Sequence, residues 1–449
     1  MIVLSLSESV HAAGFRIYDQ AAAAAGQADA FTAQADDASA VYYNPAGMTQ
    51  IRGLQFMAGT TLIGGSTHFR NAAGTSTRGD FGDSVAVPPP SNFYLTANLK
   101  DLGVTGLGDL SAGLAVLSPF GTLYQYPSNG PFATAVTSAA LELIDVKPTL
   151  AYKVNDRLSV GLGLDVYTFF NFWGEGQYET HLVSSGGAGL PPAGTQVEIN
   201  GKGTATGFNV SLMATPLRTE DGKPILNFGL VYRSQATLHL NGEFLANGTT
   251  ASRASTTLVL PQILTGGMAW WPVRDHRHEW KVEWDVDWTG WQSIKNTDVH
   301  LSTGSTIPFP QEWKNALTTM IGTQYTWLDA PLLPHWDFAL RAGYWFSESP
   351  VPDRSYNPVV PDANNHAISA GLGLTCRHGG KFFGVIDCGH VTDHWWAPKG
   401  IGLDVAYKAL LYETRTVSGN ANPVASPGAV DGAYRTTFHI GSINLRLDF

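Results

Sequence analysis

Side chains able to do chemistry are concentrated in residues 276–288, which read HRHEWKVEWDVDW. His276, His278 and Glu279 are residue types that ligate metals, but they fall in a short polar stretch that we predict to be a solvated turn. The chain contains no G-x-S-x-G, no H-E-x-x-H and no Cys/His spacing typical of a metal centre. We therefore predict that the protein is not an enzyme and holds no cofactor or metal.

The rest of that stretch alternates strictly between apolar and charged residues. Trp280, Trp284 and Trp288 share one side with two valines, whereas Glu283 and Asp285 share the other side with a lysine and a second aspartate. A period of two predicts a β-strand, and four charges exclude a dry core on their side. The strand is then either an exposed sheet of a soluble sandwich or a wall between lipid and a wet lumen.

Composition favours the second alternative. The chain has 449 residues and a formal charge of -10, with 14% charged and 44% hydrophobic residues. Charged residues are scarce against about a quarter in soluble proteins, yet no apolar run is long enough for a transmembrane helix. With 49 glycines and 11% aromatic residues, this balance is typical of a transmembrane β-barrel. The acidic charge argues against nucleic acid as a partner.

The same alternation recurs along the chain, most clearly at Leu158–Val166, Trp336–Tyr344 and Ile443–Phe449. Weaker versions lie at Phe93–Leu99, Leu110–Val116, Ile144–Tyr152, Thr204–Ala214, Leu226–Tyr232 and Leu317–Trp327. A strand of about nine residues is ~30 Å long and, tilted by ~40°, matches the ~25 Å apolar band of an outer-membrane barrel. We therefore predict an all-β transmembrane barrel with tryptophans toward lipid and carboxylates toward the lumen.

The predicted connections alternate between short and long, as they do in outer-membrane barrels. The short ones are Asn155-Asp156, Arg218–Lys223, Arg274–His278 and Arg377–Lys381. The long ones are Asn71–Pro90, Gly174–Gly201, Asn241–Ser255, Lys295–Pro310, Ser347–Asn364 and Asp393–Asp431. Short connections should face the periplasm and long ones the outside. The chain ends on Phe449 with apolar residues at alternate steps before it, which resembles the end of bacterial outer-membrane proteins.

The residues before the first strand lack its alternation. Residues 1–12 are interpreted as a partial signal peptide, with cleavage before Ala13; an ordinary disordered N-terminus is the alternative. Residues 13–52 contain an alanine-rich run that predicts short helix, which leaves residues 53–449 for the barrel. The segment 13–52 is either a periplasmic tail or a plug in the lumen. The inward charges favour the plug, since a plug can pair with them.

The two cysteines, Cys376 and Cys388, could form a disulfide in an oxidising compartment. A hairpin turned at residues 377–380 would place Cys376 opposite Phe382. The cysteines would then lie ~20 Å apart along the strands, well beyond the ~7 Å Cα limit for a disulfide. We therefore predict two free thiols.

Seven motifs occur in a defined order along the chain. They are Ala13-Gly14-Phe15, Asp36-Asp37-Ala38, Asn44-Pro45-Ala46-Gly47-Met48, Ser118-Pro119-Phe120-Gly121, Leu258–Pro261, Asp287–Trp291, and Ser349–Asp353 followed by Pro361-Asp362. This series resembles the FadL-like outer-membrane transporters of long-chain fatty acids and aromatic hydrocarbons, and it spans nearly all of the chain after residue 12. The resemblance implies a fourteen-stranded antiparallel barrel with an N-terminal plug of short helices. It also implies a monomer in the outer membrane of a Gram-negative bacterium, among outer-membrane lipid, that takes up hydrophobic small molecules passively.

The resemblance also implies a lateral exit through a gap in the wall at Pro119, Phe120 and Gly121. Proline cannot donate to a strand ladder and glycine lets the backbone bend, so this stretch can interrupt strand pairing. Residues expected to hold the shape of the plug are Asn44, Pro45, Ala46 and Gly47.

By the same resemblance, Phe15 and Phe120 are expected to contact ligand. Arg233 and Arg341 face inward by strand parity and are candidates for binding a carboxylate head group. The alternative for both arginines is pairing with lumen carboxylates, namely Asp165, Glu283, Asp285 or Asp287. Long-chain fatty acids are the expected substrates. Monoaromatic hydrocarbons such as toluene, carried by the same route, and a general porin are the alternatives.

Overall fold

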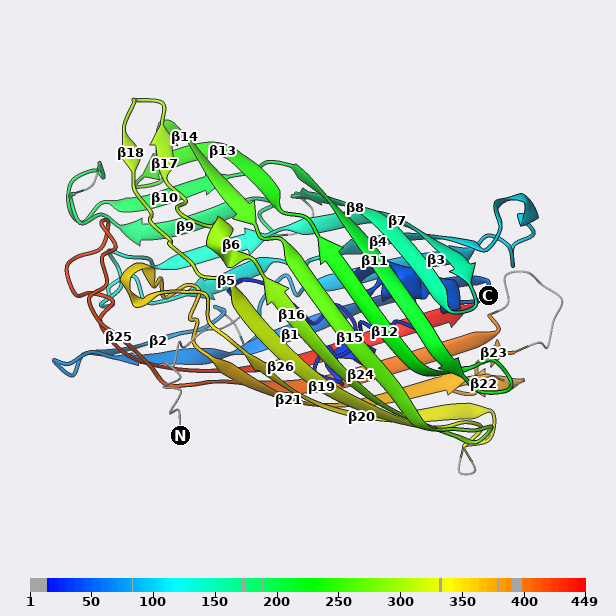
Figure 1. The fold of residues 1–449 in the computed structure, drawn as a ribbon. Coiled ribbons are helices and arrows are strands. Elements are labelled where there is room, and N and C mark those ends of the chain that lie inside the picture. The colour runs from blue at the N-terminus through cyan, green and yellow to red at the C-terminus, as the bar shows by residue number, and fades with distance from the viewer. Residues whose placement is uncertain are drawn as a thin grey trace, which may run out of the picture.

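A computed structural model describes residues 14–82, 84–171, 174–187, 189–330, 333–377, 379–389 and 398–449, and Figure 1 shows its long tilted strands closing into a barrel. Of the sixteen strands in the main sheet, β2 (Ser76–Gly79) and β25 (Arg415–Val417) only extend its ends, and the other fourteen form the barrel. The barrel closes because β1 (Leu54–Arg70) pairs with both β3 (Ser91–Asn98) and β26 (Gly432–Asp448). The predicted signal peptide, residues 1–12, lies outside the described residues.

The remaining barrel strands follow one another around the wall in chain order, each antiparallel to the next. They are β4 (Leu110–Leu117), β7 (Ile144–Asn155), β8 (Leu158–Thr168), β11 (Ala205–Arg218), β12 (Pro224–Arg233), β15 (Ile263–Arg274), β16 (His278–Thr289), β19 (Ala316–Trp327), β20 (Trp336–Ser347), β21 (Asn365–Cys376) and β24 (Gly400–Tyr412). The predicted fourteen-stranded antiparallel barrel is therefore confirmed. No helix in the described ranges is both long and apolar enough to cross a bilayer.

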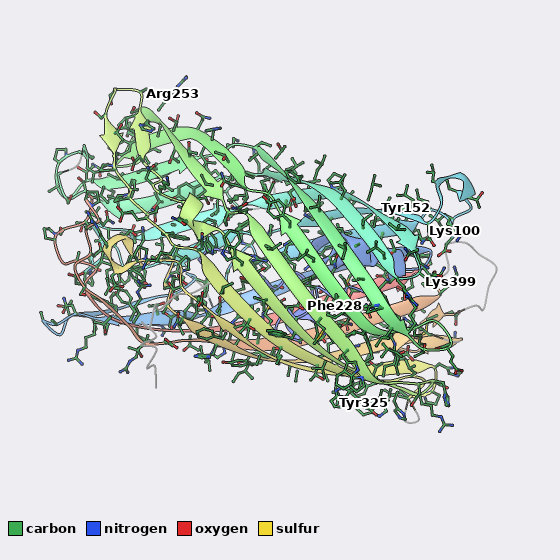
Figure 2. All side chains as sticks on the ribbon, viewed as in Figure 1. Lys100, Tyr152, Phe228, Arg253, Tyr325 and Lys399 are labelled. Atoms are coloured by element: carbon green, nitrogen blue, oxygen red, sulfur yellow. A yellow bond between two sulfur atoms is a disulfide. The ribbon has the colours of Figure 1, made fainter. Side chains whose placement is uncertain are left out.

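Strand β16 shows how the alternating sequence builds the wall. Trp280 and Trp284 are 40% and 51% exposed on the outer surface, whereas Glu283 and Asp285 are fully buried on the inside. Phe228 of β12, labelled midway along the barrel in Figure 2, belongs to the same exposed apolar surface. The outward tryptophans and inward carboxylates predicted for residues 280–288 are confirmed.

Long connections at one end of the barrel, here called the loop end, build a second sheet. Arg253 lies at this end in Figure 2, and Lys100 and Lys399 lie at the opposite end, here called the turn end. The second sheet has eight strands, which are β5 (Gly121–Gln125), β6 (Ser138–Glu142), β9 (Tyr178–Val183), β10 (Gln196–Gly201), β13 (Ala236–Ala246), β14 (Thr249–Leu260), β17 (Val299–Leu301) and β18 (Thr306–Ile307). Much of what was predicted as loop is therefore ordered sheet.

The stretch Asn241–Ser255 is one of these corrections. It was predicted to be a long loop, but it lies within the hairpin of β13 and β14, which turns at Asn247 and Gly248 with φ of 49° and 75°. Serine and threonine in this stretch suggested loop composition. Threonine nevertheless favours strands, and Asn-Gly is a strong signal for a tight hairpin turn.

The connection after β21 also differs from the prediction. The hairpin of β22 (Gly380–Phe382) and β23 (Ile386–Cys388) turns at residues 383–385, not at 377–380. Gly380 pairs with Cys388, so Cys388 lies beside Cys376 with the two Cα atoms 5.9 Å apart, and a disulfide joins them. The prediction of two free thiols is wrong because the turn was placed too early.

The same misplaced turn hid a barrel strand. Residues 393–431 were predicted to be one long loop, but β24 and β25 lie within this range. Ile401, Leu403 and Val405 of β24 alternate with glycine and aspartate, as a wall strand should. Residues 393–397, at the start of the predicted loop, lie outside the described residues.

Residues 14–52, here called the N-terminal segment, lie inside the barrel, where Figure 1 draws them in blue. The segment contains α1 (Ala22–Ala25), α2 (Ala40–Tyr43) and the 3-10 helix η1 (Pro45–Gln50), and nearly all of its side chains are buried. Small residues let it approach the wall closely. A Cβ at Gly26 would lie 2.9 Å from the Cα of Gly371 on β21.

Candidate ligand cavity and interrupted wall

The acidic side of β16 binds the N-terminal segment through backbone hydrogen bonds. Glu283 and Asp285 each accept two N–H groups from residues 31–34, at 2.6–3.2 Å. Glu283 also forms a buried ion pair with Lys281 at 2.8 Å. Because a buried carboxylate is unfavourable unless it is paired, these contacts explain how acidic residues are stable inside the barrel.

Ion pairs also hold the N-terminal segment inside the barrel. Arg16 pairs with Asp287 at 2.7 Å. Lys408 of β24 pairs with Asp19 at 2.6 Å and also with Asp29. All five side chains are buried, and each has an oppositely charged partner inside the barrel, with Lys408 shared between Asp19 and Asp29.

The Asn44–Gly47 stretch stabilises the fold of the N-terminal segment. The Asn44 side chain donates to the Thr32 carbonyl at 2.8 Å, and the Ala46 N–H donates to Ser211 Oγ of β11 at 2.9 Å. A Cβ at Gly47 would lie only 2.4 Å from the Ala35 carbonyl oxygen. These contacts join the segment to itself and to the wall.

Residues 118–121 interrupt the barrel wall. Strand β4 ends just before them, and the chain then enters β5, which belongs to the loop-end sheet. The Ile17 N–H donates to the Pro119 carbonyl at 2.9 Å, and the Gly121 N–H donates to the Phe15 carbonyl at 3.0 Å. The N-terminal segment therefore pairs like a short antiparallel strand with the interrupted part of the wall.

The neighbouring wall is weakly paired at the same height. Toward the loop end, β1 pairs with β3 only as far as Thr60. Beyond it, the Thr61 N–H donates to the Pro90 carbonyl and the Ala86 N–H donates to the Ile63 carbonyl, each at 2.8 Å, and neither Ala86 nor Pro90 belongs to a barrel strand. A connection and the N-terminal segment thus close this part of the wall in place of a regular strand ladder.

A cavity of about 160 Å³ lies beside the interruption. Residues 14–19, 81–90, 118–124 and 359–362 contribute to its lining. Trp345, Leu410, Tyr412, Phe438 and Ile440 add apolar surface from β20, β24 and β26. The Phe15 ring lies 5.9 Å from the Phe120 ring. This lining suits a hydrophobic molecule, and an apolar cavity of roughly 150 Å³ is large enough to bind benzene.

Besides tyrosines, the lining contains one basic and three acidic side chains, namely Arg16, Asp19, Glu142 and Asp362. Arg16 and Asp19 are ion-paired, as described above. Burial raises the pKa of Asp362 to about 7, although Ser349 Oγ donates a 2.6 Å hydrogen bond to it. Burial also raises the pKa of Glu142. Among the lining residues that the structure describes, the one cation already has an acidic partner, so a carboxylate ligand finds no free counter-charge.

A second recess of about 300 Å³ adjoins the cavity on the side of the loop-end sheet. The two share Phe81, Pro88, Leu123, Tyr124 and Glu142. Glu175, Glu179 and His181 make the rest of the recess polar and acidic. Nowhere in the described ranges do three His, Cys, Asp or Glu side chains form a group suited to a metal ion.

Three of the residues named from the sequence meet at the cavity. Phe15, Phe120 and Gly121 line it, and Pro119 lies at the interruption beside them. Sequence reasoning missed Asp362 as a lining residue; its only signal was the Pro361-Asp362 motif.

The two arginines named from the sequence lie elsewhere. Arg341 forms a 2.6 Å ion pair with Asp404 of β24. The Arg233 guanidinium lies 4.2 Å from the centre of the Tyr42 ring and donates to the Tyr42 carbonyl. Neither arginine is part of the cavity lining. Sequence reasoning missed Arg16 and Lys408, the cations that hold the segment beside the cavity.

Comparison with known sequences identifies relatives along most of the chain. Residues 3–381 match the family of outer membrane protein transport proteins (OMPP1/FadL/TodX). A long-chain fatty acid transport protein of Salmonella typhi is 24% identical over 82% of this chain and 85% of its own length. A putative outer membrane protein of Neisseria meningitidis serogroup B is 25% identical over 98% of this chain and 95% of its own length.

Solved structures share the fold at low sequence identity. A Pseudomonas aeruginosa FadL homologue superposes with a TM-score of 0.74 at 17% identity, over 97% of this chain and 100% of that chain. The toluene transporter TodX of P. putida superposes with a TM-score of 0.59 at 14% identity, over 92% of this chain and 94% of that chain. These likenesses show that the fold is shared.

Proposed function

We propose a transport route for this chain, which belongs to the outer membrane protein transport family (OMPP1/FadL/TodX), whose members transport hydrophobic molecules and are not enzymes. In this proposal the protein carries small uncharged hydrophobic molecules through the cavity and releases them sideways at residues 118–121. The observation that supports this most strongly is the position of the cavity. It lies directly against the one interruption found among the described wall strands, with Phe120 and Gly121 in its lining.

The route begins at the loop end, which faces the outside of the cell. The adjoining recess receives the molecule, and the shared residues lead it into the apolar cavity. Residues 13–52 act as a plug, held by Glu283 and Asp285, so that passage along the barrel axis is blocked. The exit is then the interruption, where the N-terminal strand pairing at Ile17 must release. One chain contains the whole route, which is consistent with a monomer.

The charges around the cavity support an uncharged substrate. Buried charge without a partner is strongly unfavourable, and Arg16 is already paired with Asp287. Glu142 and Asp362 add acidic groups that repel a carboxylate when they are ionised. A monoaromatic hydrocarbon such as toluene has no charge to neutralise and matches the size of the cavity.

Long-chain fatty acids are the second candidate substrates. Their support is the set of relatives named long-chain fatty acid transport proteins, which match 82% of this chain. A fatty acid would need a cation near its head group. Either Arg16 would have to exchange its partner Asp287 for the ligand, or the head group would have to remain outside the apolar cavity.

Comparative uptake tests the proposal. The chain is expressed in a bacterial strain that lacks its own transporter of this kind, and uptake of toluene and of oleate is measured beside an empty-vector control. The proposal expects faster entry of toluene with little change for oleate. Faster entry of oleate alone would favour the second candidate. Unchanged entry of both, with the barrel assembled in the outer membrane, would contradict the proposal.

A further inference from the structure

Three exposed arginines lie side by side on the outer surface at the loop end. Arg70 is on β1, Arg78 on β2 and Arg435 on β26, and all three side chains are exposed. The strand register places Arg78 and Arg435 on either side of His68 in a single row across the three strands. We call Arg70, Arg78, Arg435 and His68 the basic row.

The neighbours of the basic row show that it faces outward. Phe69, between His68 and Arg70, is buried inside against Phe132 at 4.5 Å between ring centres. Gly79, next to Arg78, has no room for a Cβ because the Tyr126 ring would lie 2.4 Å away. Successive residues of a strand point to opposite faces, so the arginines point away from the lumen.

The basic row begins where the apolar outer band ends. Leu411 is 40% exposed near the loop end of β24, and it pairs with Thr437 of β26. Arg435 lies two residues further toward the loop end, which is ~7 Å along the strand. At the other limit of the band, Leu447 is twelve residues from Arg435, or roughly 30 Å in height at a tilt of ~40°. The row is therefore level with the head groups of the outer leaflet, just above an apolar band of ~25 Å.

The arginines of the row have no acidic partner among the described residues. Throughout the described ranges, none of the three forms an ion pair, although the chain carries an excess of ten negative charges. Exposed arginines with free forks match phosphate oxygens in geometry and charge. We propose that the basic row is a docking site for a phosphorylated lipid head group of the outer leaflet, which fixes the height of the barrel beside the interrupted wall.

The test measures binding of diphosphoryl lipid A to the detergent-solubilised full chain by native mass spectrometry. Each arginine should contribute about fivefold to affinity, since a basic side chain at an anionic lipid surface is worth about 1 kcal/mol. The variant R70Q/R78Q/R435Q should therefore bind on the order of 100-fold more weakly. The matched control K202Q/R253Q/K295Q removes three exposed charges from the loop end, away from the row, and should bind like the wild type.

Two further arms keep the result interpretable. The affinity of the wild type for dephosphorylated lipid A should be no higher than the affinity of the triple variant for diphosphoryl lipid A. Excess inorganic phosphate should fail to displace the diphosphoryl lipid A from the wild type. The single variants R70Q, R78Q and R435Q, each at an exposed position, should each lose part of the affinity. Equal binding by wild type, triple variant and control would overturn the proposal, as would full displacement by inorganic phosphate.

Discussion

Two parts of the N-terminal segment, residues 27–50 and residues 14–18, meet the barrel in different ways. Residues 27–50 are held by the buried carboxylates of β16 and by side-chain hydrogen bonds to the wall, such as that from Ala46 to Ser211 of β11. Residues 14–18 contact the wall through two backbone hydrogen bonds, through aromatic rings beside the cavity and through the buried Arg16–Asp287 ion pair. In the proposed function, residues 27–50 are the fixed closure of the lumen. At the interruption itself, residues 14–18 are held by two backbone hydrogen bonds and by the Phe15–Phe120 ring contact, which can release without breaking an ion pair. A moving exit is therefore expected there.

Removing Glu283 should have the largest effect, because Glu283 holds residues 27–50 in place. Glu283→Ala leaves Lys281 and two N–H groups of the segment buried without their partner, and breaking a buried pair in this way costs about 3–5 kcal/mol. The plug should loosen and ion conductance in planar bilayers should rise. Glu220→Ala, at an exposed turn, should leave conductance low. Equally low conductance in both variants would show that Glu283 does not hold the closure.

Filling the interruption at residues 118–121 should affect the part of the segment formed by residues 14–18 and leave residues 27–50 in place. At Gly121 a Cβ would lie 3.0 Å from the Leu141 carbonyl oxygen and 3.1 Å from Ile17 Cδ1. Gly121→Val should therefore reduce toluene uptake by about tenfold, equivalent to 1.4 kcal/mol, without raising conductance. The control Gly266→Val lies on the outer face, where the nearest atom to a Cβ is 3.8 Å away in Leu230. Normal toluene uptake in Gly121→Val would argue against lateral release.

Ligand binding in the cavity should also depend on pH, through Asp362. Its pKa is raised to about 7 by burial, so Asp362 is neutral below that pH and charged above it. A raised folded pKa gives stability that is complete below the unfolded value of 3.8 and is lost as pH rises to about 7. Affinity for toluene should fall roughly threefold from about pH 6 to pH 8. Asp362→Asn should bind with little pH dependence. A wild type with a flat profile would remove Asp362 from the site.

The disulfide should have the smallest effect on transport, because Cys376 and Cys388 lie at the turn end and neither lines the cavity. The bond closes a connection of twelve residues in sequence separation, and its loss should weaken the local structure by at most about 3 kcal/mol. In Cys376→Ser/Cys388→Ser, hydrogen exchange should increase in residues 377–389, while conductance and uptake remain normal. A change in either transport measurement would mean that the turn end is coupled to the cavity.

The parts of the fold that follow from local pattern were predictable from the sequence. The alternation of β16 gave the outward tryptophans and the inward carboxylates, because strand periodicity alone determines the face of each residue. Strand β24 was missed although its alternation is clear. One turn misplaced at residues 377–380 hid β24 within a predicted loop, and it also separated two cysteines that are bonded.

The partners of inward charges could not be predicted in the same way. Strand parity places Arg341 inside, but its partner Asp404 lies two strands away on the misassigned β24. The lumen carboxylates of β16 accept hydrogen bonds from backbone N–H groups of residues 31–34. Since a backbone N–H is present whatever the side chain, the residue types at 31–34 do not identify them as partners of these carboxylates. At the cavity, Phe15 and Phe120 were named through family motifs, and Asp362 was not because its burial depends on the loop-end fold.

The most direct measurement of the central claim is the position of a bound substrate. Crystals of the protein grown with bromobenzene, a neutral monoaromatic compound, can locate bromine by its anomalous scattering. The account predicts a bromine peak in the cavity, in contact with Phe15 and Phe120 and beside Gly121. A bromine peak only along the barrel axis, on the far side of the N-terminal segment, would contradict a route through the cavity and out of the interrupted wall.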